Sequence, residues 1–175
     1  MISGTINNIH RKGLLLAVPV WIFMLAFSVP VSAQEPPPRP ITVTVTAQTL
    51  SFGAFTHGAV GGSVTINPDG SRNSGGDVIL LSLGYSFTAA KYEITANPGT
   101  LITLLNGPDV SLPGSGGGSM TLHIGSSSPA SPFVTTAVPP AVTTLYVGGT
   151  LTVGNTVANP PGNYSGNFDI TFVQE

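Results

Sequence analysis

Short runs in which apolar and polar residues alternate constrain the fold of this chain more than any other feature. Residues 41–47 alternate without exception, because threonine occupies every second position. Side chains that alternate with a period of two lie on opposite faces of a strand, so this run predicts a half-buried β-strand. Residues 146–154 and 161–173 predict two more strands joined by a polar turn that contains proline. Residues 77–83 are apolar at most positions, which predicts a strand covered on both faces.

Glycine, proline and asparagine separate these runs. Residues 67–70 (Asn-Pro-Asp-Gly) predict a turn, because proline fixes φ at the second position and glycine accepts a positive φ. Residues 106–109 (Asn-Gly-Pro-Asp) predict a hairpin between strands at 100–105 and 110–112. Strands at spacings of about 8 to 15 residues, without an amphipathic helix, predict an antiparallel immunoglobulin-like β-sandwich of a pilin-like or jelly-roll variant.

The first 33 residues have the pattern of a secretory signal peptide. A basic patch at residues 10–12 precedes an apolar run at 14–27, and small residues end the segment at Ala33, after which we expect cleavage. The apolar run contains Pro19 and is shorter than the roughly 20 residues that a membrane-spanning helix needs. We therefore expect an exported protein of the periplasm, cell surface or extracellular space, with no stable membrane anchor after signal cleavage.

Two segments follow the signal. Residues 34–40 form a proline-rich linker, since repeated prolines favour an extended conformation, and residues 41–175 form a single β-sandwich domain. The chain has no cysteine, so the stability of the domain must come from packing without disulfides. Beyond residue 33 only three lysines and arginines stand against seven carboxylates, a net charge of −4, which argues against nucleic acid as a partner.

Several motifs together resemble the bacterial domain of unknown function 4402 family. They lie at residues 50–53, 62–70, 96–99, 147–151 and 161–166. The family is similar to spore coat protein U and to fimbrial subunits of the common-pilus type, which are exported immunoglobulin-like β domains. The resemblance implies a structural role on or outside the cell, with association by donated strands. Residues 41–47 could donate such a strand, which makes Ile41, Val43 and Val45 the candidate strand-pairing contacts; the other interpretation is that they form the first strand of their own domain.

The sequence contains no clear arrangement of catalytic or metal-binding residues. We therefore expect no enzyme, no catalytic residue, no cofactor and no metal site. His57 lies at a strand end, and Asp69 or Asp77 could orient it as a general base only if folding joined them. Residues 67–73 carry alternate oxygen-bearing side chains, as at the start of a calcium loop, but Val78 stands where the bidentate glutamate belongs. We interpret this segment as a hydrated turn.

We therefore expect a non-enzymatic structural or interaction protein, with self-association or other surface proteins as partners. The alternative is a carbohydrate- or peptide-binding adhesin module that uses the loops at 114–119 and 125–132. The chain beyond residue 33 has four tyrosines and no tryptophan for stacking on sugar rings. Packing is the default role for each tyrosine, and Tyr164 is expected to bond its hydroxyl to the backbone, as a corner tyrosine does.

Overall fold

The computed structural model describes residues 40–175, and every regular element in this part of the chain is a β-strand. The strands are β1 (Thr42–Val45), β2 (Ser51–Phe52), β3 (Phe55–Ile66), β4 (Arg72–Leu80), β5 (Phe87–Thr88), β6 (Ala90–Thr95), β7 (Leu101–Asn106), β8 (Val110–Pro113), β9 (Ser119–Ser128), β10 (Phe133–Val134), β11 (Thr143–Val153) and β12 (Ile170–Gln174). The expected signal peptide, and the linker up to residue 39, lie outside the described residues. Within residues 40–175, no helix has the length and hydropathy that a membrane crossing requires.

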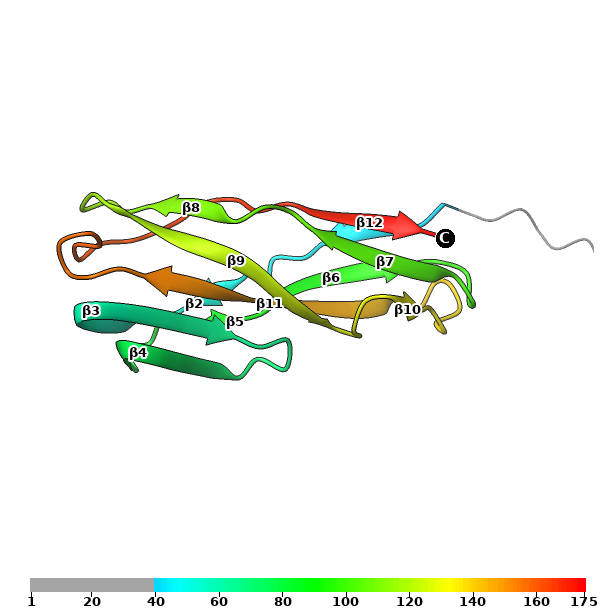
Figure 1. Cartoon of the computed structure of the whole chain (residues 1–175). Coiled ribbons are helices and arrows are strands. Elements are labelled where there is room, and N and C mark those ends of the chain that lie inside the picture. The colour runs from blue at the N-terminus through cyan, green and yellow to red at the C-terminus, as the bar shows by residue number, and fades with distance from the viewer. Residues whose placement is uncertain (1–39) are drawn as a thin grey trace, which may run out of the picture. The chain divides into compact units, whose positions relative to one another are not determined.

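The larger sheet has seven strands and is built around β11 (Figure 1). Along one edge β11 pairs first with β6 and then with β3, and along its other edge it pairs with β9. The sheet continues from β6 to β1, from β3 to β4 and from β9 to β8. All of these pairings are antiparallel, so β11 holds together strands that lie far apart in the sequence.

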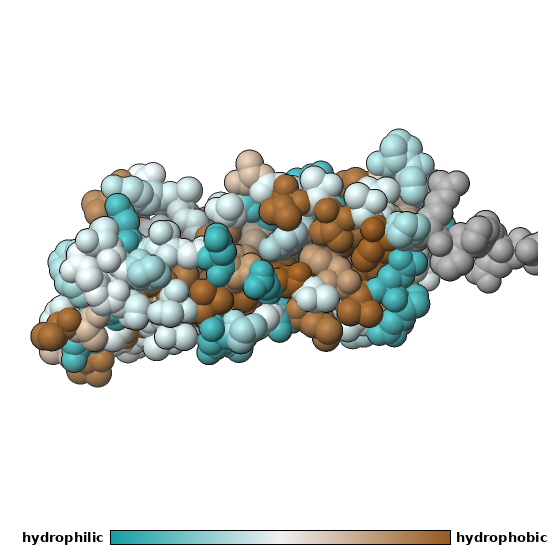
Figure 2. Space-filling model, turned by 90° about the horizontal axis from the view of Figure 1, so that it is seen from above, coloured by the Kyte–Doolittle hydropathy of each residue, from teal (hydrophilic) through white to brown (hydrophobic). Residues whose placement is uncertain are grey.

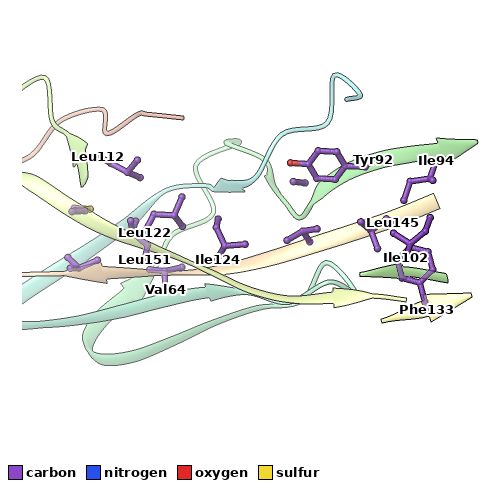
Figure 3. Close-up of a cluster of buried hydrophobic side chains, with 14 of the residues drawn as sticks. Val64, Tyr92, Ile94, Ile102, Leu112, Leu122, Ile124, Phe133, Leu145 and Leu151 are labelled. Carbon is purple, nitrogen blue, oxygen red and sulfur yellow. The ribbon is translucent and has the colours of Figure 1, made fainter. Parts of the chain in front are cut away.

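A smaller sheet of β10, β7 and β12 packs against part of the larger one. The fold is thus an antiparallel β-sandwich, as the sequence predicts. The core lies between the sheets and takes residues from both: Ile102 and Phe133 of the smaller sheet are 0% and 7% exposed, and Ile94 and Leu145 of the larger one are both 0% exposed (Figure 3). A two-stranded sheet of β2 and β5 lies beside them.

Strand β9 shows how the sequence pattern produces this arrangement. Met120, Leu122 and Ile124 are buried, whereas Thr121 and His123, which alternate with them, are exposed. One face of the strand therefore supplies the core and the other meets solvent. The expectation that His123 faces solvent is confirmed. Its ring bonds to Asp109 at 2.7 Å, but both side chains are more than half exposed, so the pair adds little to stability.

The turn at residues 67–70 is confirmed. The Gly70 N–H donates to the Asn67 carbonyl at 2.9 Å, and Gly70 has a φ of 84°, so the turn joins β3 to β4 as a hairpin. The strand that follows differs from its prediction. It ends at Leu80 instead of residue 83, and Ile79 is 62% exposed, because β4 is the last strand on its side of the sheet and has no layer over that side chain.

The hairpin predicted at residues 106–109 is wrong. Strand β7 pairs with β10 and β12 in the smaller sheet, whereas β8 pairs with β9 in the larger one. The segment between them carries the chain from one sheet to the other, and the Gly107 N–H donates to the Asp169 carbonyl at 2.9 Å. A turn sequence determines where the chain reverses direction. It does not determine which strand the following segment pairs with.

The two C-terminal strands also differ from their prediction. Strands β11 and β12 do not pair with each other, since the partners of β12 lie on β7. Strand β12 begins only at Ile170, and residues 165–169 take no regular ladder. Proline and glycine at 160–162 and Gly166 interrupt the backbone pattern that a strand needs. A long irregular segment therefore crosses the side of the domain where a second sheet would otherwise cover the core.

Candidate functional site

The three candidate contact residues lie on or next to β1, which pairs with β6 of the same chain. Val43 stands opposite Ile94 and Val45 opposite Tyr92, while the Ile41 N–H donates to the side-chain oxygen of Gln174 at 3.1 Å. Ile41 and Val43 pack against the core. Val45 does not: it is 72% exposed, which corrects the expectation of a continuous buried face. The reason is that Val45 opens onto a large groove where the opposing layer is missing.

This groove has a volume of about 930 Å³, near the upper end of the range for ligand pockets. Its floor is the inner face of the larger sheet, and one wall is formed by residues 45–57 and the other by residues 159–168. The floor residues are Ala90, Tyr92, Leu112, Met120, Leu122 and Leu151. Each of these six residues is at most 9% exposed, so the walls already cover most of the floor.

The first wall is tied to the strands behind it. The Thr46 N–H donates to the Lys91 carbonyl at 3.3 Å, and the Lys91 N–H donates to the Gln48 carbonyl at 3.0 Å. Further along, β2 pairs with β5, and the Leu81 N–H donates to the Ala54 carbonyl at 3.0 Å. These bonds connect the first wall to β6, to β5 and to the segment that follows β4.

The second wall is tied to the other side of the domain. The Ser115 N–H donates to the Asn163 carbonyl at 2.9 Å, and the Tyr164 hydroxyl donates to the Pro160 carbonyl at 2.7 Å. The latter bond confirms Tyr164 as a corner tyrosine. Among the described residues, the backbone groups of residues 166–168 have no backbone hydrogen-bond partner. An extended backbone in this position is a template for another strand.

The groove carries almost no charge. None of the residues that line it is a carboxylate, and its cation, Lys91, is bonded to Glu93 at 2.8 Å. The hydrogen bond from Lys91 to Glu93 raises the pKa of the lysine. Amides and hydroxyls from the two walls surround an apolar floor, so the groove suits an uncharged, partly apolar occupant.

The residues considered for catalysis are not joined to one another. His57 Nε2 lies 3.0 Å from the Asn159 carbonyl, and its Nδ1 is buried without a partner among the described residues. The Asp69 carboxylate accepts bonds from the Ser71 N–H and hydroxyl at 2.8 and 2.7 Å, which lower its pKa, while Asp77 lies 3.4 Å from the Val60 nitrogen. Neither carboxylate is hydrogen-bonded to His57.

The oxygen-bearing residues at 67–73 form an ordinary turn. The Asn67 amide donates to the Ser71 hydroxyl at 2.8 Å, so these side chains bond to each other. In the part of the chain that the structure describes, no group of three or more His, Cys, Asp or Glu side chains is placed to hold a metal ion.

A second apolar surface lies on the outside of the smaller sheet. Val134 and Leu105 are 54% and 53% exposed, and Figure 2 shows hydrophobic residues gathered over β7 and β12. The register of these strands places Val134 beside Leu101 and Val173 beside Thr103 on the same face. The strands beneath this surface pair with one another in the order β10-β7-β12, so β7 is covered on both of its edges.

Comparison with known proteins identifies the family. The model of a family described as a domain of unknown function, DUF4402, matches residues 41–173. The chain belongs to the DUF4402 family. No curated protein and no solved structure matched the chain. The matched residues include both walls and the floor of the groove.

The floor residues of the DUF4402 domain were not found from the sequence. Leu112, Leu122 and Leu151 alternate with polar neighbours as any core residue does. The available signal was the break in alternation at residues 160–168, where two prolines and two glycines prevent a regular strand. That break indicates that one layer of the sandwich is incomplete, although it does not say which side chains it leaves uncovered.

Proposed function

We propose that the protein is an exported, non-enzymatic structural or interaction protein of the bacterial cell surface or periplasm, a pilin-like or coat-like subunit that associates by pairing of β-strands. The observation that supports this proposal is the groove: an apolar floor between two walls, one of which has no backbone hydrogen bonds at residues 166–168 among the described residues. A partner strand gains main-chain hydrogen bonds along such a wall, and its alternate side chains fill the apolar channel.

The first candidate for the partner strand is residues 41–47 of a second copy. This run has no charge and alternates valine or isoleucine with threonine, which fits a groove that also lacks free charge. No residue of β1 is fully buried in its own domain. Exchange of β1 between copies gives up the partial burial of Ile41 and Val43, while insertion into the groove would cover the aliphatic side chains of the donated strand, Val45 among them.

Replacing Val45 by aspartate tests this association. Val45 is 72% exposed in its own domain, so Val45→Asp should change the free energy of unfolding by less than about 0.5 kcal/mol. In a filled groove the same carboxylate would be desolvated without a partner, which we expect to weaken self-association about 100-fold or more. Light scattering after size-exclusion chromatography of the chain from Gln34 onward measures this change.

The matched control is Thr44→Asp, which adds the same charge on the opposite, exposed face of β1. We expect that variant to associate nearly as the unchanged protein does. The proposal of self-association is wrong if the unchanged protein stays monomeric at every concentration tested, or if the two aspartate variants weaken association equally.

One observation favours the alternative of a carbohydrate- or peptide-binding adhesin module. Tyr85 is 68% exposed at the mouth of the groove, and Phe52, Tyr164 and Phe168 line its walls beside the amides of Asn163 and Asn167. Exposed aromatic rings beside amides are suited to sugar rings. Binding of the monomer to a glycan array, lost in Tyr85→Ala and retained in Val45→Asp, would favour this function over strand pairing.

A further inference from the structure

Tyr92 brings a polar group into the floor of the groove. It lies on β6, its residue is only 9% exposed, and its ring packs edge-on against Phe172 with centroids 5.6 Å apart. Figure 3 shows the hydroxyl oxygen directed away from Ile94, toward the end of the cluster where Leu112, Leu122 and Leu151 lie. Tyr92 and these three leucines all line the groove.

The hydroxyl of Tyr92 has no hydrogen-bond partner among residues 40–175. Burial raises the pKa of Tyr92, and no hydrogen bond contributes to that shift. Tyr164 is the contrasting case, because its hydroxyl is bonded to a carbonyl of its own wall. In the open groove, water can satisfy the Tyr92 hydroxyl, whereas an occupant that displaces this water leaves the hydroxyl unpaired unless it supplies an oxygen.

We propose that the Tyr92 hydroxyl determines which segments the groove accepts, by donating a hydrogen bond to an acceptor oxygen of the incoming strand. This inference rests on the proposed function, because it specifies the partner of the same groove. Elsewhere the floor is aliphatic or thioether side chains, over which an alternating strand can shift by two residues at small cost. The Tyr92 hydroxyl must donate to an acceptor oxygen, so it favours the one register that places an oxygen above it and disfavours the registers shifted by two residues.

The partner is therefore an uncharged extended segment that places an oxygen over Tyr92. The oxygen comes either from a main-chain carbonyl or from a threonine hydroxyl, and residues 41–47 contain both. A segment that places neither kind of oxygen at this point would leave a buried donor unpaired, which disfavours its binding in the groove.

The test measures binding of a synthetic peptide with the sequence of residues 41–47 to the chain from Gln34 onward, at concentrations where that chain is monomeric. Tyr92→Phe removes the hydroxyl and keeps the ring against Phe172, so we expect the domain to stay folded and the peptide to bind about three- to tenfold more weakly. Tyr146→Phe on β11, whose side chain does not line this groove, is the matched control and should leave the affinity unchanged.

A second readout is the pKa of the Tyr92 hydroxyl. Donation of a hydrogen bond stabilises the protonated hydroxyl, so bound peptide should move the ultraviolet titration of one tyrosine to higher pH. This shift should be absent in Tyr92→Phe. Peptides with one threonine changed to valine at a time identify the source of the oxygen. If one of them loses affinity only toward the unchanged protein, the source is that hydroxyl; if all bind alike, it is a carbonyl.

Two results would overturn the inference, and they are distinguishable. Equal affinity of the peptide for the unchanged protein and for Tyr92→Phe would remove the role of the hydroxyl and leave the proposed function standing. Absence of any peptide binding to the unchanged protein would remove strand pairing by this segment, and the inference with it.

Discussion

Replacing Asn159 by alanine is expected to lower the free energy of unfolding by about 3 kcal/mol, enough to lower the melting temperature by roughly 10 °C. The Asn159 side chain makes several hydrogen bonds at one end of the groove, and the residue is only 1% exposed. Its Oδ1 accepts from the Gly154 N–H, and its Nδ2 donates to the Ser119 carbonyl at 2.7 Å. The alanine variant removes these bonds, the bond from Nδ2 to the Ala158 carbonyl and the packing of a buried side chain, which is why the expected loss exceeds that of one ordinary hydrogen bond.

The effect should extend from stability to binding. Asn159 begins the second wall of the groove and, through its own carbonyl, accepts a bond from His57 of the first wall at 3.0 Å. Thermal and urea unfolding measure the stability. The affinity of the folded protein for the peptide shows whether the second wall is still correctly positioned. The control is Asn167→Ala, since this exposed amide of the same wall has no hydrogen bond among the described residues and should change stability by less than about 0.5 kcal/mol. Similar losses in both variants would contradict the role of Asn159.

The sequence predicted the strand class because alternation is a local property. β9 buries one face and exposes the other, β11 buries every second residue from Leu145 to Val153, and the turn at residues 67–70 closes its hairpin, so the patterns at these sites determine the structure. The corner tyrosine was found for the same reason, because Tyr164 bonds to a carbonyl four residues away. Where the interacting groups are close in sequence, the local residue pattern is enough to predict the interaction.

The sequence did not predict which strands pair. β12 pairs with β7, and β11 pairs with β3, β6 and β9, although the alternation of each strand is compatible with many partners. Pairing depends on how the whole chain divides into two layers, so the hairpin at residues 106–109 was assigned to one sheet when its arms belong to two.

The candidate site was predicted only in part, for a related reason. Val43 and Val45 lie on the predicted alternating strand and Ile41 lies just before it, but Val45 is 72% exposed instead of sharing a buried face with them. The groove lies where the second layer of the sandwich is incomplete, and no sequence motif marks such a place. Tyr92 was read as a packing residue, and its ring does pack, while the orientation of its hydroxyl depends on Phe172, a residue 80 positions later.

The other large effect is expected at Gly62, where a side chain on β3 would meet the backbone of β4. A Cβ at this position would lie 2.1 Å from the carbonyl oxygen of Gly75 and 3.1 Å from Cα of Gly76, and both are backbone atoms that cannot rotate away. Gly62→Ala should therefore separate the two strands and lower the free energy of unfolding by about 3 kcal/mol. Unfolding in urea measures this loss.

The control separates this clash from strain of the backbone. Gly70 has a φ of 84° and open space around it, so Gly70→Ala introduces strain without a clash and should cost about 1 kcal/mol. If Gly62→Ala proves no more destabilising than Gly70→Ala, the two strands are not in close contact at this point. The contact matters beyond stability, because the pairing of β3 and β4 changes register between His57 and Gly62, and His57 belongs to the first wall of the groove. A loss of peptide binding in Gly62→Ala under conditions where the domain remains folded would show that this close approach positions the wall.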